Sequence, residues 1–254
     1  MTLAGPRRGS SPWGLPLAAA IALGWSLSLI VLLRLDLAAL PWPLLVGAVL
    51  LRTLLHTGLF IVGHDAMHGV LVPGRRHWND RLGATALALY AALPYGSCRR
   101  NHQLHHRCTA TAADPDYHPD AHAGFWAWYR RFMGGYLRAG QMARLLTGWA
   151  GLAAAAWTLG PTGPLNVLCF CVLPLLLSSL QLFGFGTYLP HRQQRQPLAA
   201  PDPASLDLPV WLSLLACFHF SYHLEHHQNP SLAWFELPAQ RRRRRLLASA
   251  VAPA

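Results

Sequence analysis

Long apolar segments alternate with short polar segments along the chain. The first apolar segment runs from Leu15 to Leu33 and the second from about Leu44 to Gly63, with a turn around Pro41 and Pro43 between them. About 20 apolar residues in a helix cross the hydrocarbon core of a bilayer, whereas the apolar region of a secretory signal is shorter. We therefore expect both segments to be retained transmembrane helices that form a hairpin.

A second pair of apolar segments lies in the C-terminal half. It comprises Leu145–Leu159 and a segment from Leu165 to about Tyr188, separated by the Gly- and Pro-rich sequence at 160–164. Such a composition is typical of a tight turn, and Pro190 is expected to end the last helix. The stretch Leu82–Pro94 is too short to span, so we expect it to be interfacial or re-entrant.

These segments predict an all-α integral membrane protein with two transmembrane helical hairpins, about four spans, and interfacial helices. We expect a single domain over residues 1–254, with flexible tails at 1–14 and 239–254. The composition agrees, because 53% of the residues are hydrophobic and only 12% are charged, well below the usual share of charge in a soluble domain. The five cysteines form no CxxC pair, which argues against a disulfide framework or a zinc ribbon.

The net charge of +11 raises the question of a nucleic-acid partner. The basic residues, however, lie in short loops and in the run Arg241–Arg245 instead of along one polar face, so we expect contact with anionic lipid and no nucleic acid. Among the loop arginines, only Arg34 falls on the side of the membrane opposite the histidine-rich segments. The positive-inside rule therefore predicts a bacterial inner-membrane protein with the histidine-rich cap and both termini in the cytoplasm.

Nine of the fourteen histidines fall into four close groups. His64 and His68 are four residues apart, and an HxxHH pattern occurs twice; residues three or four apart share one face of a helix. His105 and His106 diverge by about 100°, so one helix can supply two metal ions. Nine imidazoles are too many for one tetrahedral ion and predict a dinuclear site. The expected ligands are His64, His68, His102, His105, His106, His191, His223, His226 and His227.

Other polar residues near these groups have two possible roles. Asp65, Asp114, Asp116 and Glu225 are expected to orient imidazoles from the second coordination shell, although a solvated loop is an equal alternative for Asp114 and Asp116. His219 is either a metal ligand itself or a hydrogen-bond donor in the second coordination shell.

Arg52 falls inside the second predicted helix, where it is either functional or packed against a polar neighbour. The remaining histidines are expected at the surface: His56, His77, His118 and His122.

Several short motifs resemble a known family. The HxxxH motif and the two HxxHH motifs, called histidine boxes below, lie beside membrane hairpins and resemble those of the membrane-bound diiron desaturases and hydroxylases. Further motifs resemble the bacterial β-carotene ketolases. The motifs are His64-Asp65-Ala66-Met67-His68-Gly69, Val72-Pro73-Gly74-Arg75, His105-His106-Arg107, Asp114-Pro115-Asp116, Phe185-Gly186-Thr187, Leu189-Pro190-His191-Arg192, Cys217-Phe218-His219-Phe220 and Glu225-His226-His227.

The resemblance implies a nonheme diiron oxygenase that converts C4 of a carotenoid β-ionone ring to a ketone. It implies two iron ions on the nine histidines, O2 as cosubstrate and an external electron donor such as ferredoxin. Thr187 occupies a position where related acyl desaturases carry a water-mediated asparagine, and Cys108 one where some ketolases have a histidine. Trp126, Trp128, Phe183 and Phe185 are candidates to line the substrate path, with aromatic-belt or core packing as the alternative.

Three other functions stay open at this point. A carotenoid β-ring hydroxylase uses similar histidine boxes, and a fatty acyl desaturase or hydroxylase uses the same kind of centre. A membrane metal transporter or sensor is the alternative without catalysis, but transport sites lie near the bilayer midplane, whereas these histidines are expected at one membrane face. The sequence leaves open the preferred ring, the electron donor and the oligomeric state.

Overall fold

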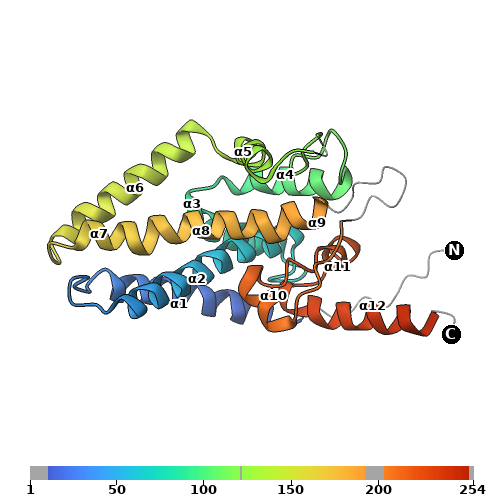
Figure 1. Ribbon diagram of the computed structural model, residues 1–254, viewed down its shortest axis with the longest axis horizontal. Helices are drawn as coiled ribbons and strands as arrows, with labels where there is room; N and C mark the ends of the chain where they lie inside the picture. The colour runs from blue at the N-terminus through green and yellow to red at the C-terminus, as the bar shows by residue number, and fades with distance from the viewer. Residues whose placement is uncertain (1–10, 121, 193–202, 252–254) are drawn as a thin grey trace.

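The computed structural model describes residues 11–120, 122–192 and 203–251, and these form helices and no strand. The long helices run side by side along the longest axis of the molecule, and the shorter helices α4, α9 and α11 meet near one end of them (Figure 1). The predicted all-α fold is confirmed.

Within the described residues, three helical segments are long and apolar enough to cross a membrane. They are α1 (Gly14–Leu32), α2 (Trp42–His68) and the continuous segment Gly163–Arg192. The fourth expected span is α6 (Ala139–Trp157), which packs against the start of the last segment. It is less apolar, because its first turns carry Gln141 and Arg144 and much of the remainder is Gly and Ala.

The last spanning segment alternates between α-helical and π-helical turns. It consists of α7 (Gly163–Val167), η1 (Leu168–Val172), α8 (Leu173–Leu182), η2 (Phe183–Tyr188) and α9 (Leu189–Arg192). Pro190 was expected to end this helix, but the helix continues to Arg192, so that prediction is wrong. A proline has no backbone N–H to donate, and its ring crowds the preceding helical turn. The wider π-turn of η2 directly before Pro190 makes room for the ring and tolerates the missing hydrogen bond.

Helix α3 (Arg76–Ala91) packs closely along the end of α2. Two glycines allow this approach. A Cβ atom on Gly63 would lie 2.6 Å from the buried Leu87 side chain, and one on Gly83 would lie 2.6 Å from Ala66. The close packing fixes the part of α2 that carries His64 and His68 against α3, which leads into α4 (Tyr95–Arg107) and, further on, α5 (Phe125–Tyr136).

The C-terminal part folds back over the histidine-rich end through short helices. These are α10 (Val210–Cys217), α11 (His223–Gln228), the 3-10 turn η3 (Trp234–Glu236) and α12 (Leu237–Val251). Residues 239–251, which we expected to form a flexible tail, therefore belong to a helix. Arg244 anchors this helix by an ion pair with Glu225 of α11 at 2.6 Å. At the other end, residues 11–13 lead directly into α1, which begins at Gly14, and residues 1–10 lie outside the described part of the chain.

Arg52 and His56 lie inside the helix bundle. The guanidinium of Arg52 donates to the carbonyl of Phe170 at 3.0 Å and to Ser28 Oγ at 3.0 Å, which agrees with the inward-packed alternative. His56 accepts a hydrogen bond from Trp25 Nε1 at 3.0 Å, and its other ring nitrogen lies 2.7 Å from the Tyr90 carbonyl. The surface position expected for His56 is therefore wrong, because its face of α2 is covered by α1 and α3.

Candidate metal centre

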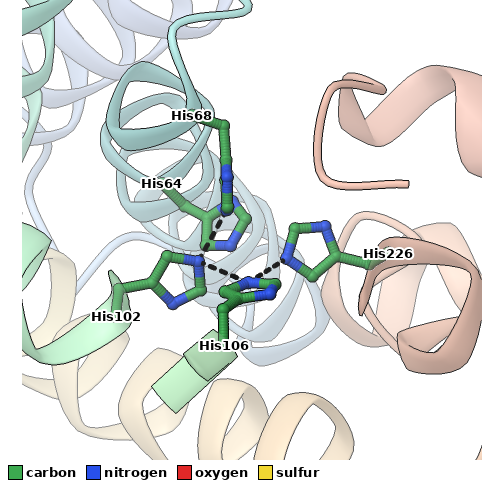
Figure 2. Close-up of side chains that lie close together, drawn as sticks. All are labelled: His64, His68, His102, His106 and His226. Atoms are coloured by element: carbon green, nitrogen blue, oxygen red, sulfur yellow. Dashed lines mark hydrogen bonds between the residues drawn. The ribbon is translucent and has the colours of Figure 1, made fainter. Parts of the chain in front are cut away.

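The nine expected histidines come together in two groups at the end of the helix bundle. Each histidine contributes one ring nitrogen, and within each group these nitrogens all lie within 4.8 Å of one another. The first group, shown in Figure 2, is His64, His68, His102, His106 and His226. The second group is His105, His191, His223 and His227. Four segments that are distant in the sequence, α2, α4, α9 and α11, supply these side chains.

Two helices contribute to both groups, as the HxxHH spacing predicts. On α4, His102 and His106 point into the first group, whereas His105 points into the second. On α11, His226 joins the first group, and His223 and His227 join the second. Residues three or four apart share a helix face, so each HxxHH motif divides its imidazoles between two neighbouring sites.

In both groups the Nε2 atoms converge at short distances. In the first, His68 Nε2 lies 2.7 Å from His102 Nε2, which is 3.1 Å from His106 Nε2; that atom lies 3.0 Å from His226 Nε2. In the second, the corresponding distances are 3.0 Å from His105 to His227, 3.2 Å from His227 to His223 and 3.1 Å from His223 to His191.

This arrangement fits a metal ion better than a hydrogen-bond network. The Nε2 atoms of His102 and His106 each face two other Nε2 atoms, and a single N–H proton satisfies only one of these contacts. Among the described residues, the buried Nε2 of His64 has no hydrogen-bond partner. Nitrogen atoms that converge in this way supply the lone pairs that iron, zinc or copper prefers. The donor set therefore fits one metal ion for each group.

The electrostatic environment keeps most of these imidazoles neutral. Burial, together with the neighbouring imidazoles, lowers the pKa of His102, His223 and His226 well below the ordinary value, and that of His106 to about 2. His105 is the exception. Burial lowers its pKa, but the hydrogen bond to Asp114 and the nearby carboxylates more than compensate, so its pKa is raised. Neutral imidazoles have the free lone pair that a metal requires.

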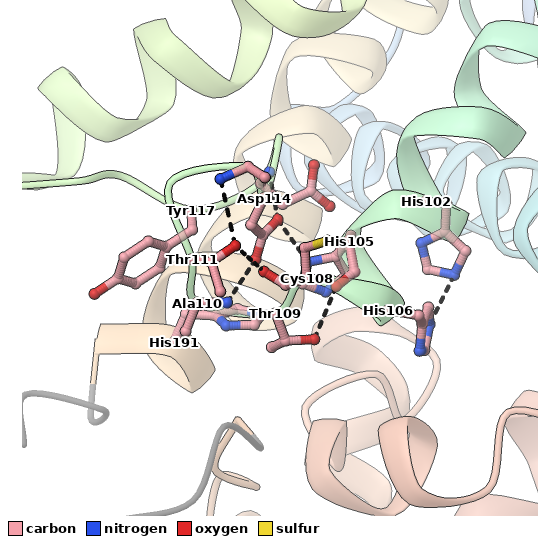
Figure 3. A network of polar contacts seen from close by, with 12 residues as sticks. His102, His105, His106, Cys108, Thr109, Ala110, Thr111, Asp114, Tyr117 and His191 are labelled. Carbon is pink, nitrogen blue, oxygen red and sulfur yellow. Dashed lines mark hydrogen bonds and ion pairs between the residues drawn. The ribbon is translucent and has the colours of Figure 1, made fainter. Parts of the chain in front are cut away.

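Asp114 is the carboxylate that orients an imidazole most directly. Its Oδ1 lies 2.9 Å from His105 Nδ1 and also accepts from the Asp116 backbone N–H, and its Oδ2 accepts from the Ala110 N–H at 2.9 Å (Figure 3). Asp114 is buried, so the solvated-loop alternative is wrong for it. The contact places the His105 proton on Nδ1 and directs Nε2 toward the second group.

The other predicted orienting residues behave differently. Asp65 Oδ1 lies 3.4 Å from His64 Nδ1, and its Oδ2 accepts from the Trp234 backbone N–H at 3.2 Å. Glu225 is bound by Arg244 instead of an imidazole. Asp116 is buried too, but it accepts from Tyr136. Neither Glu225 nor Asp116 has a hydrogen bond to a grouped histidine among the described residues, so their expected contacts are not found.

His219 lies outside both groups. Its Nδ1 is 3.2 Å from Ser213 Oγ, and its ring stacks with those of Tyr222 and Trp234. Although His219 lies four residues before His223, the two do not share a helix face, because Phe218 and His219 have positive φ angles and α11 begins only at His223.

Two adjoining cavities lead to the histidines. The inner cavity, of about 60 Å³, is bounded on one side by His64, His102, His105 and His223. The apolar cavity, of about 550 Å³, lies among α2, α5, α6 and α8. The two share four lining side chains, which connect the space among the helices with the metal-binding groups: Phe60, Phe132, Tyr136 and Leu182.

The four aromatic residues expected to line a substrate path do not line either cavity. Trp126 is exposed, whereas Trp128 and Phe183 pack with Tyr188 in a separate aromatic cluster. Phe185 packs against the main core. The alternative of core packing is thus correct for three of them. Of the two remaining predicted residues, Thr187 is buried and lines the inner cavity, and Cys108 is half-buried at the end of α4.

The apolar helical bundle and its paired imidazole groups are compatible with a membrane protein that binds metal, and sequence comparison identifies the family. The profile of the Fatty acid desaturase family matches residues 40–253, so the chain belongs to this family. Within it, the chain is similar to proteins named beta-carotene ketolase. One, from Paracoccus sp. strain N81106 / MBIC 01143, is 40% identical over 82% of this chain and 83% of its own length.

Two further relatives carry related names. A beta-carotene ketolase from Paracoccus sp. strain PC1 is 39% identical over 90% of this chain and 92% of its own length. A zeaxanthin 4-ketolase from Chlamydomonas reinhardtii is 34% identical over 84% of this chain but only 48% of its own length, so this chain spans about half of the algal protein. These names agree with the resemblance drawn from the histidine boxes and the adjoining motifs.

Proposed function

We propose that the protein is a carotenoid ketolase that converts the C4 methylene of a β-ionone ring to a ketone, with O2 and external electrons. The observation that carries this proposal is the position of the two imidazole groups beside an inner cavity that joins an apolar cavity among the helices. The names of the relatives, which specify β-carotene or zeaxanthin, supply the substrate class.

The two groups would hold two iron ions. His64, His68, His102, His106 and His226 would bind one, and His105, His191, His223 and His227 the other. Bound iron and O2 would supply the oxidising power that removes hydrogen from an allylic carbon, a step for which no side chain is a strong enough base. The protein's own contribution is to fix the imidazoles, through contacts such as Asp114 with His105.

The cavities explain how a bilayer-soluble substrate reaches this centre. The walls of the apolar cavity are formed mainly by aliphatic and aromatic side chains, which suit a polyene; examples are Tyr90, Leu145, Trp149 and Leu175. The ring would enter the inner cavity past Phe60 and reach the histidines. The polar groups are concentrated in the inner cavity, where His64, His102, His105 and His223 lie.

Formation of a ketone requires two oxidations at the same carbon. In each, one O2, two electrons and two protons convert a C–H bond into C–OH and release one water. The second oxidation gives a geminal diol, which loses water to form the ketone. The electrons come from an external carrier such as ferredoxin.

We place the histidine-rich end and both termini in the cytoplasm of a bacterial cell, because the loop arginines lie on that side.

Three alternatives make different predictions. A β-ring hydroxylase would stop after oxidation at C3, and a fatty acyl desaturase or hydroxylase would act on an acyl chain. A metal transporter would hold its ligands along a path near the bilayer midplane. The grouped histidines instead lie at the ends of α2 and α9 and on α4 and α11, at one end of the bundle (Figure 1).

Expression in a bacterium that makes β-carotene, followed by chromatography of the pigments, tests the proposal. We expect echinenone and canthaxanthin from the unaltered chain, and neither from a His105→Ala variant. In vitro, 18O2 should label the keto oxygen under conditions that limit exchange with water. Products hydroxylated at C3, or unchanged β-carotene despite bound iron and a reductant, would contradict the proposal.

A further inference from the structure

The wall of the inner cavity contains one pair of polar side chains that the metal site does not use. Asp116 lies in the loop before α5, and Tyr136 is the last residue of α5. The Tyr136 hydroxyl donates to Asp116 Oδ1 at 2.8 Å, and both residues line the cavity beside His105. Much of the surrounding wall is apolar, with Phe60, Ile61, Met67, Phe132, Leu182 and Phe220.

The carboxylate of Asp116 is held firmly in this position. Its backbone N–H donates to Asp114 Oδ1 at 2.9 Å, and its carbonyl accepts from Trp128 Nε1 at 2.9 Å. Tyr136 occupies one carboxylate oxygen, and no side chain or backbone group among the described residues forms a hydrogen bond with the other, Oδ2. The pair therefore has hydrogen-bonding capacity left for a ligand in the cavity.

A purely hydrocarbon ring cannot use this capacity. Burial of a carboxylate without a full set of partners costs free energy, and here burial raises the pKa of Asp116 to about 6. A ring with a hydroxyl group would supply the missing partner. Under the proposed function, β-carotene has no hydroxyl group when it binds, but the first oxidation places one on C4, beside the imidazole groups that the cavity adjoins.

We propose that Asp116, held in place by Tyr136, binds the C4 hydroxyl of the singly oxidised ring and keeps it in the inner cavity for the second oxidation. The inference rests on the proposed function. These residues would thus have a positioning role: they keep the 4-hydroxy intermediate in the cavity, so that it is oxidised to the 4-keto product before it is released. Asp116 accepts the hydrogen bond of the ring hydroxyl, and Tyr136 fixes the carboxylate for this contact.

The test compares Tyr136→Phe with Tyr129→Phe. Tyr129 is a matched control, because it lies on the same helix, loses one hydrogen bond to Ser179 on substitution and lines only the apolar cavity. With purified enzyme, the readouts are the ratio of 4-hydroxy to 4-keto product from β-carotene and kcat/KM for added 4-hydroxy-β-carotene relative to β-carotene. For Tyr136→Phe we expect the product ratio to rise and the relative kcat/KM to fall, each by about fivefold.

Asp116→Leu is the second variant and should show larger changes in the same directions. Iron content is measured for every variant. The inference is wrong if Tyr136→Phe leaves the product ratio unchanged, if Tyr129→Phe changes it equally, or if Tyr136→Phe lowers iron content. It is also wrong if Tyr136→Phe changes only the preference between zeaxanthin and β-carotene, because the pair would then bind the C3 hydroxyl. Absence of ketone from the unaltered enzyme would instead contradict the proposed function.

Discussion

His105 Nδ1 lies 2.9 Å from Asp114 Oδ1, and both side chains are almost completely buried. The same carboxylate accepts two backbone N–H groups, from Ala110 and Asp116, so it is held independently of the histidine. It therefore fixes both the orientation and the tautomer of an imidazole whose Nε2 faces the second group.

Asp114→Asn should weaken metal binding at the second group. An amide carries no charge and presents an NH2 group where an acceptor is needed, and loss of such outer partners typically lowers metal affinity by about 10- to 100-fold. Titration of the purified protein with Fe(II) measures this effect. Asp120→Asn, in the same loop but exposed, serves as the control and should leave affinity unchanged. Equal affinities for the two variants would contradict the role of Asp114.

Gly63→Ala should destabilise the protein and reduce iron content. Its Cβ atom would lie 2.6 Å from the buried Leu87 side chain, and overpacking of this kind typically costs about 1–3 kcal/mol. The resulting shift of α2 would displace the adjacent His64. Gly47→Ala, on the same helix, meets nothing within 4 Å and is the matched control. Thermal unfolding in detergent should show a lower Tm for the Gly63 variant alone; equal Tm values would argue against the tight α2–α3 contact.

Arg244→Ala should loosen α12 and, through it, α11. Arg244 Nε lies 2.6 Å from Oε1 of Glu225. The Glu225 side chain is fully buried, and the residue lies between His223 and His226 in the sequence. Removal of one partner leaves a buried carboxylate with fewer contacts, which is costly. We expect faster proteolysis of the C-terminal region and lower iron content than in Arg243→Ala, a change at an exposed neighbouring position. Identical behaviour of the two variants would refute this anchoring role.

The two groups should differ in their response to acid. The pKa of His105 is raised, so it takes up a proton at a higher pH than His102, His106 or His226, whose pKa values are lowered. Protons therefore compete with metal first at the second group. As the pH falls, iron should therefore leave in two steps: first from the second group, above the ordinary histidine pKa, and from the first group only at a lower pH. In His227→Ala, which retains the first group, iron should persist to lower pH than in His226→Ala; the reverse order would contradict this assignment.

The sequence predicts those parts of the site that depend on local geometry. The division of His102, His105 and His106 between two groups follows from helical periodicity alone, and the apolar lengths predict α1 and α2. The cavities are different, because side chains such as Phe60 and Trp149 approach only after helices distant in the sequence have packed.

Local context also misled the interpretation of some polar residues. His56 has no histidine neighbours in sequence and was expected at the surface, but α1 and α3 cover it. Asp116 was grouped with Asp114 because of its proximity in sequence, yet its side chain turns toward Tyr136. Short-range spacing carries no information about contacts with distant segments, so these roles were visible only in the folded structure.

The most direct test of the central claim is the iron content of the purified, pigment-converting protein. The two imidazole groups predict about two iron ions per chain, falling to about one in His226→Ala, which affects only the first group, and to about one in His227→Ala, which affects only the second. Both variants should lose ketone formation. Active protein without bound iron, or a variant that retains both iron ions and full activity, would contradict the account.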